Sequence, residues 1–344
     1  MAIDSIAALK REPQLGLLLA GEAVRATQDD DRPVPVAEQA LRGVLSLYNG
    51  SGVINYHNAS ISGVAFSPDA SQLAVASFDG TVSIWHLEAL EPIMMAILKG
   101  SFEPIVDMGF SPDGRFLVTS SGHGIVDLWE SATGVMLTRI RGASAITRIV
   151  ISPDGRYLIT GEENSSVSVW DLATGQPVTL LARDAEAVTA MAVSPDGRWL
   201  AIGSRDSTIH IWKSLDRDNS KSILLRSHNA MISTLAFSPN GHWLAAGSMD
   251  GTASLWDWNA PAADPMLLRG HEDAINHLVI SPDAHWLVTG SWDETARLWD
   301  LRAPNPAEKS IRLLGGGAIN TYQLAQTPVY SLPEVVMVQH VCGT

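Results

Sequence analysis

The sequence predicts an all-β fold in which one small antiparallel sheet is repeated along the chain. A turn signal, Ser-Pro-Asp or Ser-Pro-Asn, occurs six times, and successive copies lie 41 to 44 residues apart. These turns begin at Ser67, Ser111, Ser152, Ser194, Ser238 and Ser281. Eighteen residues after each turn serine stands a tryptophan, at Trp85, Trp129, Trp170, Trp212, Trp256 and Trp299. A fixed period of this length indicates that each copy is one structural unit that packs on its neighbours.

Each copy contains short apolar runs of period two that are separated by turn residues. In the fifth copy, residues 232–237 form one run, residues 243–248 a second and residues 252–256 a third. Polar turns between such runs are typical of antiparallel hairpins. A fourth run at residues 265–268 leads to the next copy, so each copy predicts a four-stranded antiparallel sheet.

Such a sheet has two apolar faces and cannot bury both alone. Radial stacking gives every sheet two neighbours, which is the arrangement of a β-propeller. We expect seven blades over residues 48–344, of which six are clear and the seventh is irregular. Residues 318–344 would supply most of the seventh blade, and a strand at residues 53–57 would complete it. The turn signal and the tryptophan are missing there, so we expect an exposed strand edge.

Dipeptides at the repeat boundaries carry a family resemblance over roughly residues 50 to 325. Trp-Asp stands at residues 170–171, 256–257 and 299–300, and Gly-His stands at residues 270–271. With these motifs at this period, the chain resembles the WD40-repeat β-propeller family.

The resemblance implies a buried hydrogen-bonded network in which one blade contributes a His, a Ser, an Asp and the Trp. Three copies have all four residues. These are His57, Ser77, Asp79 and Trp85; His228, Ser248, Asp250 and Trp256; and His271, Ser291, Asp293 and Trp299. The fourth copy has Asp184 in place of the His. The third has Gly142, Glu162 and Asn164 instead, and the second has Ser101 and His123, so we expect the third and second blades to pack more loosely.

Ser, His and Asp also form hydrolase triads, so a catalytic interpretation has to be compared with the structural one. A catalytic set occurs once, whereas this set recurs at the period of the fold. The histidines show no metal-ligand spacing and the carboxylates show no paired arrangement. We therefore expect no catalytic residues, no metal site and no cofactor.

Residues 1–47 have a helical rather than a strand period. Pro13 precedes a run with apolar residues at Leu15, Leu18 and Leu19, residues 27–35 form a loop, and a second apolar run follows it. This predicted helical hairpin resembles the connector of prokaryotic STAND-type signalling ATPases. The resemblance implies either the C-terminal part of a longer protein or a stand-alone relative, with an ATPase module acting in cis or in trans. No P-loop motif occurs in the sequence.

Composition narrows the classes of partner and the compartment. The net charge is −14 with no basic run, which disfavours nucleic-acid binding. The longest apolar run, residues 15–20, is too short to span a membrane, and we see no signal peptide. A single cysteine, Cys342, is compatible with a reducing compartment, so we expect a cytoplasmic protein.

The resemblance also indicates where a partner would bind, since such propellers commonly bind peptides or proteins on one face. The side chains that precede the turn aspartates would lie on that face, either as partner contacts or as isolated exposed side chains that cover the strand ends: Phe78, Glu163, Arg205, Met249 and Trp292. Ser62, Thr147, Thr189, Ser233 and Asn276 would line the central channel, for which a structural role is favoured. We expect a non-catalytic scaffold or sensor that binds a protein or peptide. The alternative is the C-terminal regulatory propeller of a STAND-type ATPase.

Overall fold

The computed structural model describes residues 56–87, 93–100, 103–181, 186–213, 222–258, 264–308, 310–314, 321–324 and 335–338. The helical hairpin predicted for residues 1–47 lies outside these ranges. So does most of the predicted strand at residues 53–57, of which Tyr56 and His57 are described and are not in a strand. Both predictions stay predictions.

Six four-stranded antiparallel sheets follow one another along the chain, as the repeats predict. Sheet 1 contains β1 (Ile61–Phe66), β2 (Gln72–Ser77), β3 (Thr81–His86) and β4 (Ile93–Lys99). Sheet 2 contains β5 (Ile105–Phe110), β6 (Phe116–Ser121), β7 (Ile125–Glu130) and β8 (Met136–Arg141). Sheet 3 contains β9 (Ile146–Ile151), β10 (Tyr157–Glu162), β11 (Val167–Asp171) and β12 (Pro177–Leu181).

The next three sheets have the same order of strands. Sheet 4 contains β13 (Val188–Val193), β14 (Trp199–Ser204), β15 (Thr208–Lys213) and β16 (Ser222–Arg226). Sheet 5 contains β17 (Ile232–Phe237), β18 (Trp243–Ser248), β19 (Ala253–Asp257) and β20 (Met266–Leu268). Sheet 6 contains β21 (Ile275–Ile280), β22 (Trp286–Ser291), β23 (Thr295–Asp300) and β24 (Ser310–Leu314), and a short 3₁₀ helix, Pro306–Glu308, precedes its last strand.

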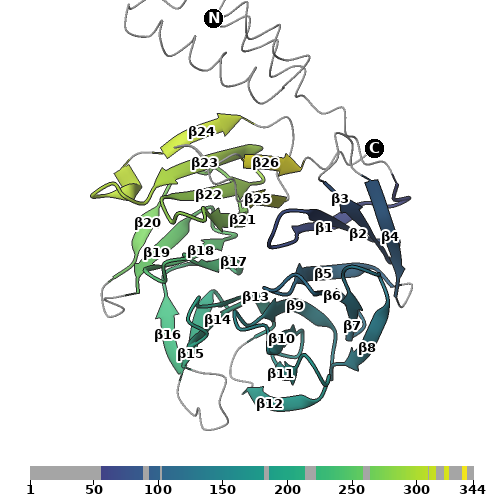
Figure 1. Ribbon diagram of the computed structural model, residues 1–344. Helices are drawn as coiled ribbons and strands as arrows, with labels where there is room; N and C mark the ends of the chain where they lie inside the picture. Colours follow the sequence, from purple (N-terminus) through teal and green to yellow (C-terminus); the bar gives the residue numbers. More distant parts are fainter. Residues whose placement is uncertain are drawn as a thin grey trace, which may run out of the picture. The chain divides into compact units, whose positions relative to one another are not determined.

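The six sheets are arranged around a common centre (Figure 1). The first strand of each sheet is the inner one, and the inner strands β1, β5, β9, β13, β17 and β21 contact one another in this order. The fourth strand of each sheet is the outer one and lies at the circumference. This is the radial stacking expected of a propeller.

A smaller sheet lies between sheet 6 and sheet 1. It consists of β25 (Thr321–Leu324) and β26 (Val335–Val338), which pair antiparallel with Thr321 opposite Val338. β25 contacts both β21 and β1, so the ring of inner strands continues through it. Within the described ranges this sheet has two strands, and a complete seventh blade is therefore not shown.

The six Ser-Pro-Asp/Asn turns are fixed by the same side-chain bonds. In sheet 4, the Ser194 hydroxyl donates to Asp196 Oδ1 at 2.5 Å, and the same carboxylate oxygen accepts from the Arg198 amide at 3.0 Å. The Ser194 hydroxyl also accepts from the Trp199 amide at 2.9 Å, where β14 begins. These short-range bonds close the hairpin between the first and second strands, which explains why the turn signal marks each repeat.

The hydrophobic core lies between neighbouring sheets. One cluster combines Ile209 and Ile211 of sheet 4 with Ile232 and Leu244 of sheet 5, and all four are at most 1% exposed. Close contact depends on a small residue in the second strand. A Cβ atom added to Gly203 would lie 2.6 Å from Ile232 Cγ2 of the next sheet. The close spacing of sheets 4 and 5 therefore depends on the contact between Gly203, which has no side chain, and the β-branched side chain of Ile232.

Candidate functional site

The upper face of the ring is defined here by the turns between the second and third strands and by the segments that lead into the inner strands. All five predicted contact residues lie on it at one equivalent position. Each donates its backbone N–H to a carbonyl of the segment that leads into the inner strand. The pairs are Phe78 with Ser60 at 2.9 Å, Glu163 with Ala145 at 2.9 Å, Arg205 with Ala187 at 3.2 Å, Met249 with Met231 at 3.0 Å and Trp292 with Ala274 at 3.0 Å.

Two of these five residues are large, apolar and exposed. Phe78 is 51% exposed and Trp292 is 49% exposed, while Met249 is partly buried. Glu163 and Arg205 are exposed and charged. Because a backbone hydrogen bond fixes the main chain at each of these five residues, their Cα atoms have defined positions on the upper face.

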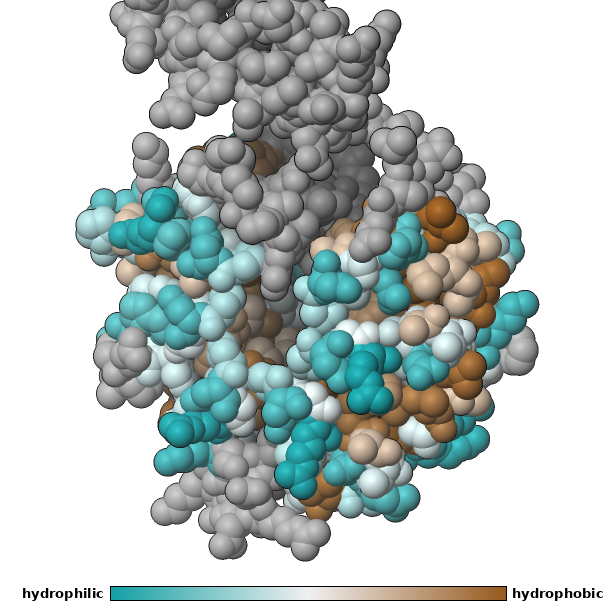
Figure 2. All heavy atoms as spheres, in the orientation of Figure 1, coloured by the Kyte–Doolittle hydropathy of each residue, from teal (hydrophilic) through white to brown (hydrophobic). Residues whose placement is uncertain are grey.

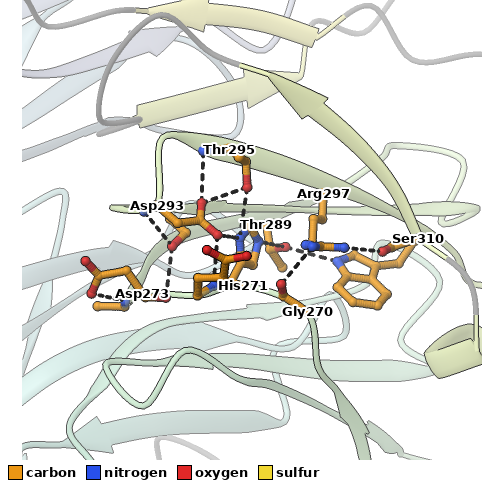
Figure 3. A network of polar contacts seen from close by, with 12 residues as sticks. Gly270, His271, Asp273, Thr289, Asp293, Thr295, Arg297 and Ser310 are labelled. Atoms are coloured by element: carbon orange, nitrogen blue, oxygen red, sulfur yellow. Dashed lines mark hydrogen bonds and ion pairs between the residues drawn. The ribbon is translucent and has the colours of Figure 1, made fainter.

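A buried network in sheet 6 supports this face (Figure 3). His271 Nδ1 lies 2.9 Å from Asp293 Oδ2, and His271 Nε2 lies 2.8 Å from the Thr289 hydroxyl. The indole N–H of Trp299 donates to the same hydroxyl at 3.0 Å. Asp293 also accepts from the amides of Glu272 at 3.0 Å and Thr295 at 2.9 Å. The network thus ties the segment into β21 to the turn between β22 and β23.

The hydroxyl between His271 and Trp299 belongs to Thr289, whereas the sequence-based prediction assigned Ser291 to the network. Ser291 has a neighbouring function. Its hydroxyl donates to the Asp273 carbonyl at 2.9 Å and accepts from the Asp293 amide at 3.1 Å, so it fixes the turn. Ser77 and Ser248 likewise accept from the amides of the turn aspartates, at 3.1 Å in both sheets.

In sheets 1 and 5 the bridging hydroxyl comes from the third strand. His57 Nε2 lies 2.8 Å from the Ser83 hydroxyl, which also accepts from the indole N–H of Trp85 at 2.8 Å. His228 Nε2 lies 2.6 Å from the Ser254 hydroxyl. The carboxylates of Asp79 and Asp250 lie 3.4 and 3.2 Å from the Nδ1 atoms of His57 and His228. Trp256 is 3% exposed and packs in the cluster with Leu244.

The charge state of these pairs follows from burial and hydrogen bonding. Burial lowers the pKa of His228 and of His271, so both imidazoles are neutral at physiological pH. Burial opposes ionisation of Asp293, but the bonds from Thr295, Glu272 and His271 outweigh it, and the pKa of Asp293 is lowered. An ionised carboxylate can only accept, so His271 carries its proton on Nδ1, and its Nε2 accepts a hydrogen bond from the Thr289 hydroxyl.

A hydroxyl, an imidazole and a carboxylate in this order are also the components of a hydrolase triad. Here Thr289 is 0% exposed, and its hydroxyl is bonded to both Trp299 and His271. It can therefore reach no substrate, and this arrangement stabilises the fold.

Sheets 2 and 3 lack the histidine and replace it with other buried polar groups. In sheet 2, the Asp127 carboxylate accepts two hydrogen bonds from the Arg139 guanidinium, at 2.6 and 3.0 Å. Gly100 lies beside this carboxylate, and a Cβ atom added to Gly100 would lie 2.6 Å from Asp127 Oδ2. In sheet 3, Glu162 is 0% exposed and accepts from the Ser168 hydroxyl at 3.1 Å. Ser101 and Asp184 lie outside the described ranges. The expectation of looser packing in these two sheets stays a prediction.

The centre of the ring holds a cavity of about 480 Å³ that is lined by the inner strands. Of the five residues predicted to line the channel, Ser62, Ser233 and Asn276 border this cavity. The hydroxyls of Thr147, Thr189 and Ser233 donate to carbonyls of the second strand of their own sheet. The single hydroxyl protons of Thr189 and Ser233 are shared with carbonyls of the next sheet, those of Ile232 and Ile275, so these hydroxyls join neighbouring sheets.

Ionisable residues that sequence reasoning missed occur one position later in the inner strands. Asp107, Arg148 and His277 line the cavity. Asp107 Oδ2 accepts from the Ile149 amide of the next sheet at 2.9 Å. Burial raises the pKa of Asp107. The charge of Arg148 and the bonds from the Ile149 and Met108 amides act to lower this pKa, but burial outweighs them. In the sequence, each of these residues appears as an isolated ionisable side chain within an apolar run. The prediction of channel residues considered only the small polar side chains one position earlier.

Comparison with protein-family models gives one family for this arrangement. The model described as "WD domain, G-beta repeat" matches residues 51–86, 93–130, 134–171, 175–213, 219–257 and 265–300. The chain belongs to the WD40-repeat family. A search of curated proteins found no significant match.

The WD40 repeats are offset from the sheets. The match at residues 93–130 spans β4 to β7, so it joins the outer strand of sheet 1 to three strands of sheet 2. Each of the five later matches joins the outer strand of one sheet to three strands of the next, which interlocks the ring. The first match begins at residue 51 and includes the strand predicted at residues 53–57.

Among the residues that the structure describes, no three or more His, Cys, Asp and Glu side chains are grouped in a way that could hold a metal ion. In the same part of the chain, no helix has the length and apolar character needed to cross a membrane.

Proposed function

We propose that this WD40 chain is a non-catalytic interaction module that binds a protein or peptide on its upper face. The observation that carries the proposal is the set of five side chains held at one equivalent position by the same backbone bond. Aromatic, Met and Arg side chains are enriched at interface hot spots, and Phe78, Trp292, Met249 and Arg205 are of these types. A rigid frame reduces the entropy that is lost when a partner binds.

The charge around these residues favours a basic partner. Glu163, Glu186, Glu272 and Glu294 are exposed on the upper face, while Arg205 is the basic member of the five contact residues. With a net charge of −14, the chain attracts cationic partners and repels nucleic acid. We place this activity in the cytoplasm, where the single cysteine remains reduced.

Replacing Trp292 tests this proposal. Trp292→Asp is expected to reduce partner capture at least tenfold, about 1.4 kcal/mol, because it removes a large exposed aromatic side chain and adds a charge. The measurement is quantitative affinity capture from an extract of the source cells with the native chain and the variant. Ile311→Asp is the matched control, since Ile311 is 47% exposed in the same sheet but lies on the outer strand β24.

Partners are assigned to the upper face if the control captures them as well as the native chain does and Trp292→Asp does not. Undiminished capture by Trp292→Asp, with an unchanged melting temperature, would exclude this face as the binding surface.

Regulation of a STAND-type ATPase is the second candidate function. It rests on the resemblance of residues 1–47 to the connector of such ATPases. An immunoblot of source-cell extract separates the two candidates. A band near 36.9 kDa supports a stand-alone module that acts in trans, and a much larger band supports a regulatory domain in cis.

A further inference from the structure

The outer surface of sheets 1 and 2 carries an apolar patch that the proposed function does not use. The outer apolar patch consists of Ile93, Met94 and Met95 at the start of β4 and Val135, Met136 and Leu137 at the start of β8. Their exposed fractions are 58%, 40%, 45%, 55%, 44% and 49%, in this order. Figure 2 shows hydrophobic side chains gathered on the right of the ring, where Figure 1 places β4 and β8.

The two parts of the patch are neighbours in space. A Cβ atom added to Gly134, which directly precedes Val135, would lie 2.9 Å from Ala96 Cβ and 3.0 Å from Leu98 Cδ2 of β4. Six half-exposed aliphatic side chains leave on the order of 500 Å² of apolar surface, near the upper end of the roughly 300–600 Å² of the largest patch on a typical monomer.

β4 has fewer of the features that protect three of the other outer strands from edge pairing: its register with β3 shifts at Met95, and its one charged residue is the terminal Lys99. It lies at the edge of sheet 1, where it pairs with β3 on one side and with no other described strand. Pro177 in β12, the three-residue length of β20 and Arg312 in β24 each discourage pairing with another strand. β4 has six uncharged apolar residues in a row, Ile93 to Leu98, before Lys99. A long apolar edge is a template for strand pairing.

We propose that β4 and the start of β8 form an interface with a second copy of this chain, in which β4 pairs antiparallel with β4 of the second copy. The middle of the strand is self-complementary, because a two-fold axis near Ala96 places Met94 opposite Leu98 and Met95 opposite Ile97, with each Lys99 opposite Ile93 at an end of the paired segment. Such a two-fold contact uses the same surface on both copies.

The area of the patch favours a second copy. Two chains of net charge −14 repel each other at long range, but neither β4 nor β8 contains an acidic residue, so the acidic groups of the chain lie outside the contact strands. Two patches together supply roughly 1,000 Å² of apolar surface, and the paired backbone edges bring the contact to the roughly 1,200 Å² or more of specific interfaces.

Sedimentation velocity of the full chain over a dilution series tests the proposal. We expect a species of twice the 36.9 kDa chain mass, with a larger share of dimer at high salt because salt screens the repulsion between the copies. Met95→Lys is expected to weaken dimerisation at least tenfold, since it places a charge between the strands. Ile223→Lys is the matched control, since Ile223 is 42% exposed on the outer strand β16, and it should dimerise as the native chain does.

A native chain that stays monomeric at all concentrations overturns the proposal, as does a Met95→Lys variant that dimerises like the native chain. Loss of the dimer in the control as well would locate the interface elsewhere and also contradict the proposal. If Met95→Lys lowers the melting temperature, Met94→Lys provides the same test at a second exposed position.

Discussion

His271 and His228 are held neutral inside the fold, and this affects how the protein responds to acid. Both side chains are at most 1% exposed, and each lies between a carboxylate and a hydroxyl. A protonated imidazole carries a hydrogen on Nε2 and cannot accept a hydrogen bond there, so protonation removes the bond from Thr289 of the second strand to His271 and the bond from Ser254 of the third strand to His228. Acid therefore destabilises the network by protonating its two buried imidazoles.

We expect the melting temperature to fall as the pH drops from 7 to 5. An unfolded histidine has a pKa of about 6.5, and the folded pKa values of His228 and His271 are lower. Below about pH 6.5 the unfolded chain therefore binds more protons than the folded chain, and stability decreases. Asp250 and Asp293, whose pKa values are lowered in the fold, add a second decline below about pH 4.

Melting curves at pH 8, 6.5 and 5 measure this effect. His271→Gln should melt at a lower temperature at pH 8 but lose part of the pH dependence. His285→Gln is the control, because His285 is 44% exposed beside Asp283, and it should keep the native dependence. A native melting temperature that stays constant over this range would refute the expectation.

The sequence predicted most of the network but not the bridging hydroxyl. His, Asp and Trp recur at fixed spacings, whereas the hydroxyl has two sources. In sheets 1 and 5 it comes from the third strand, as in Ser83, because the second-strand position holds Val75 or Ala246. In sheet 6, Arg297 occupies the third-strand position and bonds to the Gly270 carbonyl at 2.7 Å, so Thr289 supplies the hydroxyl. The choice depends on packing within each sheet.

At the scale of the element, the contact between sheets is closest where a second-strand glycine faces the first residue of the next inner strand. Gly161, Gly203 and Gly247 face Val188, Ile232 and Ile275, with added Cβ atoms 2.5 to 2.7 Å from a side-chain carbon. β-branched side chains on a packed inner strand cannot turn away. Any added atom must therefore push two sheets apart.

We predict that Gly203→Ala destabilises the protein by about 1–3 kcal/mol through overpacking. Gly109→Ala is the matched control, since an added Cβ there meets no atom within 4 Å. Urea unfolding of both variants measures the difference in the free energy of unfolding. Equal stability of the two variants would show that the sheets can separate at little cost.

Sheet and strand order could be predicted because each strand has its own local signal. Period-two runs and Ser-Pro-Asp/Asn turns recur six times, and the strands expected at residues 252–256 and 265–268 appear as Ala253–Asp257 and Met266–Leu268. Beyond residue 320 neither the turn serine nor the tryptophan occurs. No local pattern there fixes the strands, and the pairing of β25 with β26 depends on the neighbouring sheets.

At the scale of the whole molecule, β25 closes the circle of inner strands. Its contacts with β21 and β1 cover two strands that would otherwise each lack one neighbour. The two ends of the ring are thereby linked through a strand that carries no repeat signal.

A chain that ends after Leu314 is expected to melt at a lower temperature than the native chain and to bind a hydrophobic dye. The truncation removes β25 and exposes apolar surface on both neighbouring strands. A chain that ends after Val338 keeps both strands of the small sheet and is the control. If the shorter chain melts as the control does, the six sheets are stable without closure.

The position of β25 in the chain also determines when the ring can close during translation. Hairpins within each sheet involve near neighbours in sequence and form as the chain leaves the ribosome, whereas contacts between distant segments form slowly. β1 and β21 must then wait for residues 321–338 to emerge. In that interval the β25 segment of another nascent chain can dock in the gap, so exchanged rings are the expected misassembled product when synthesis is slow.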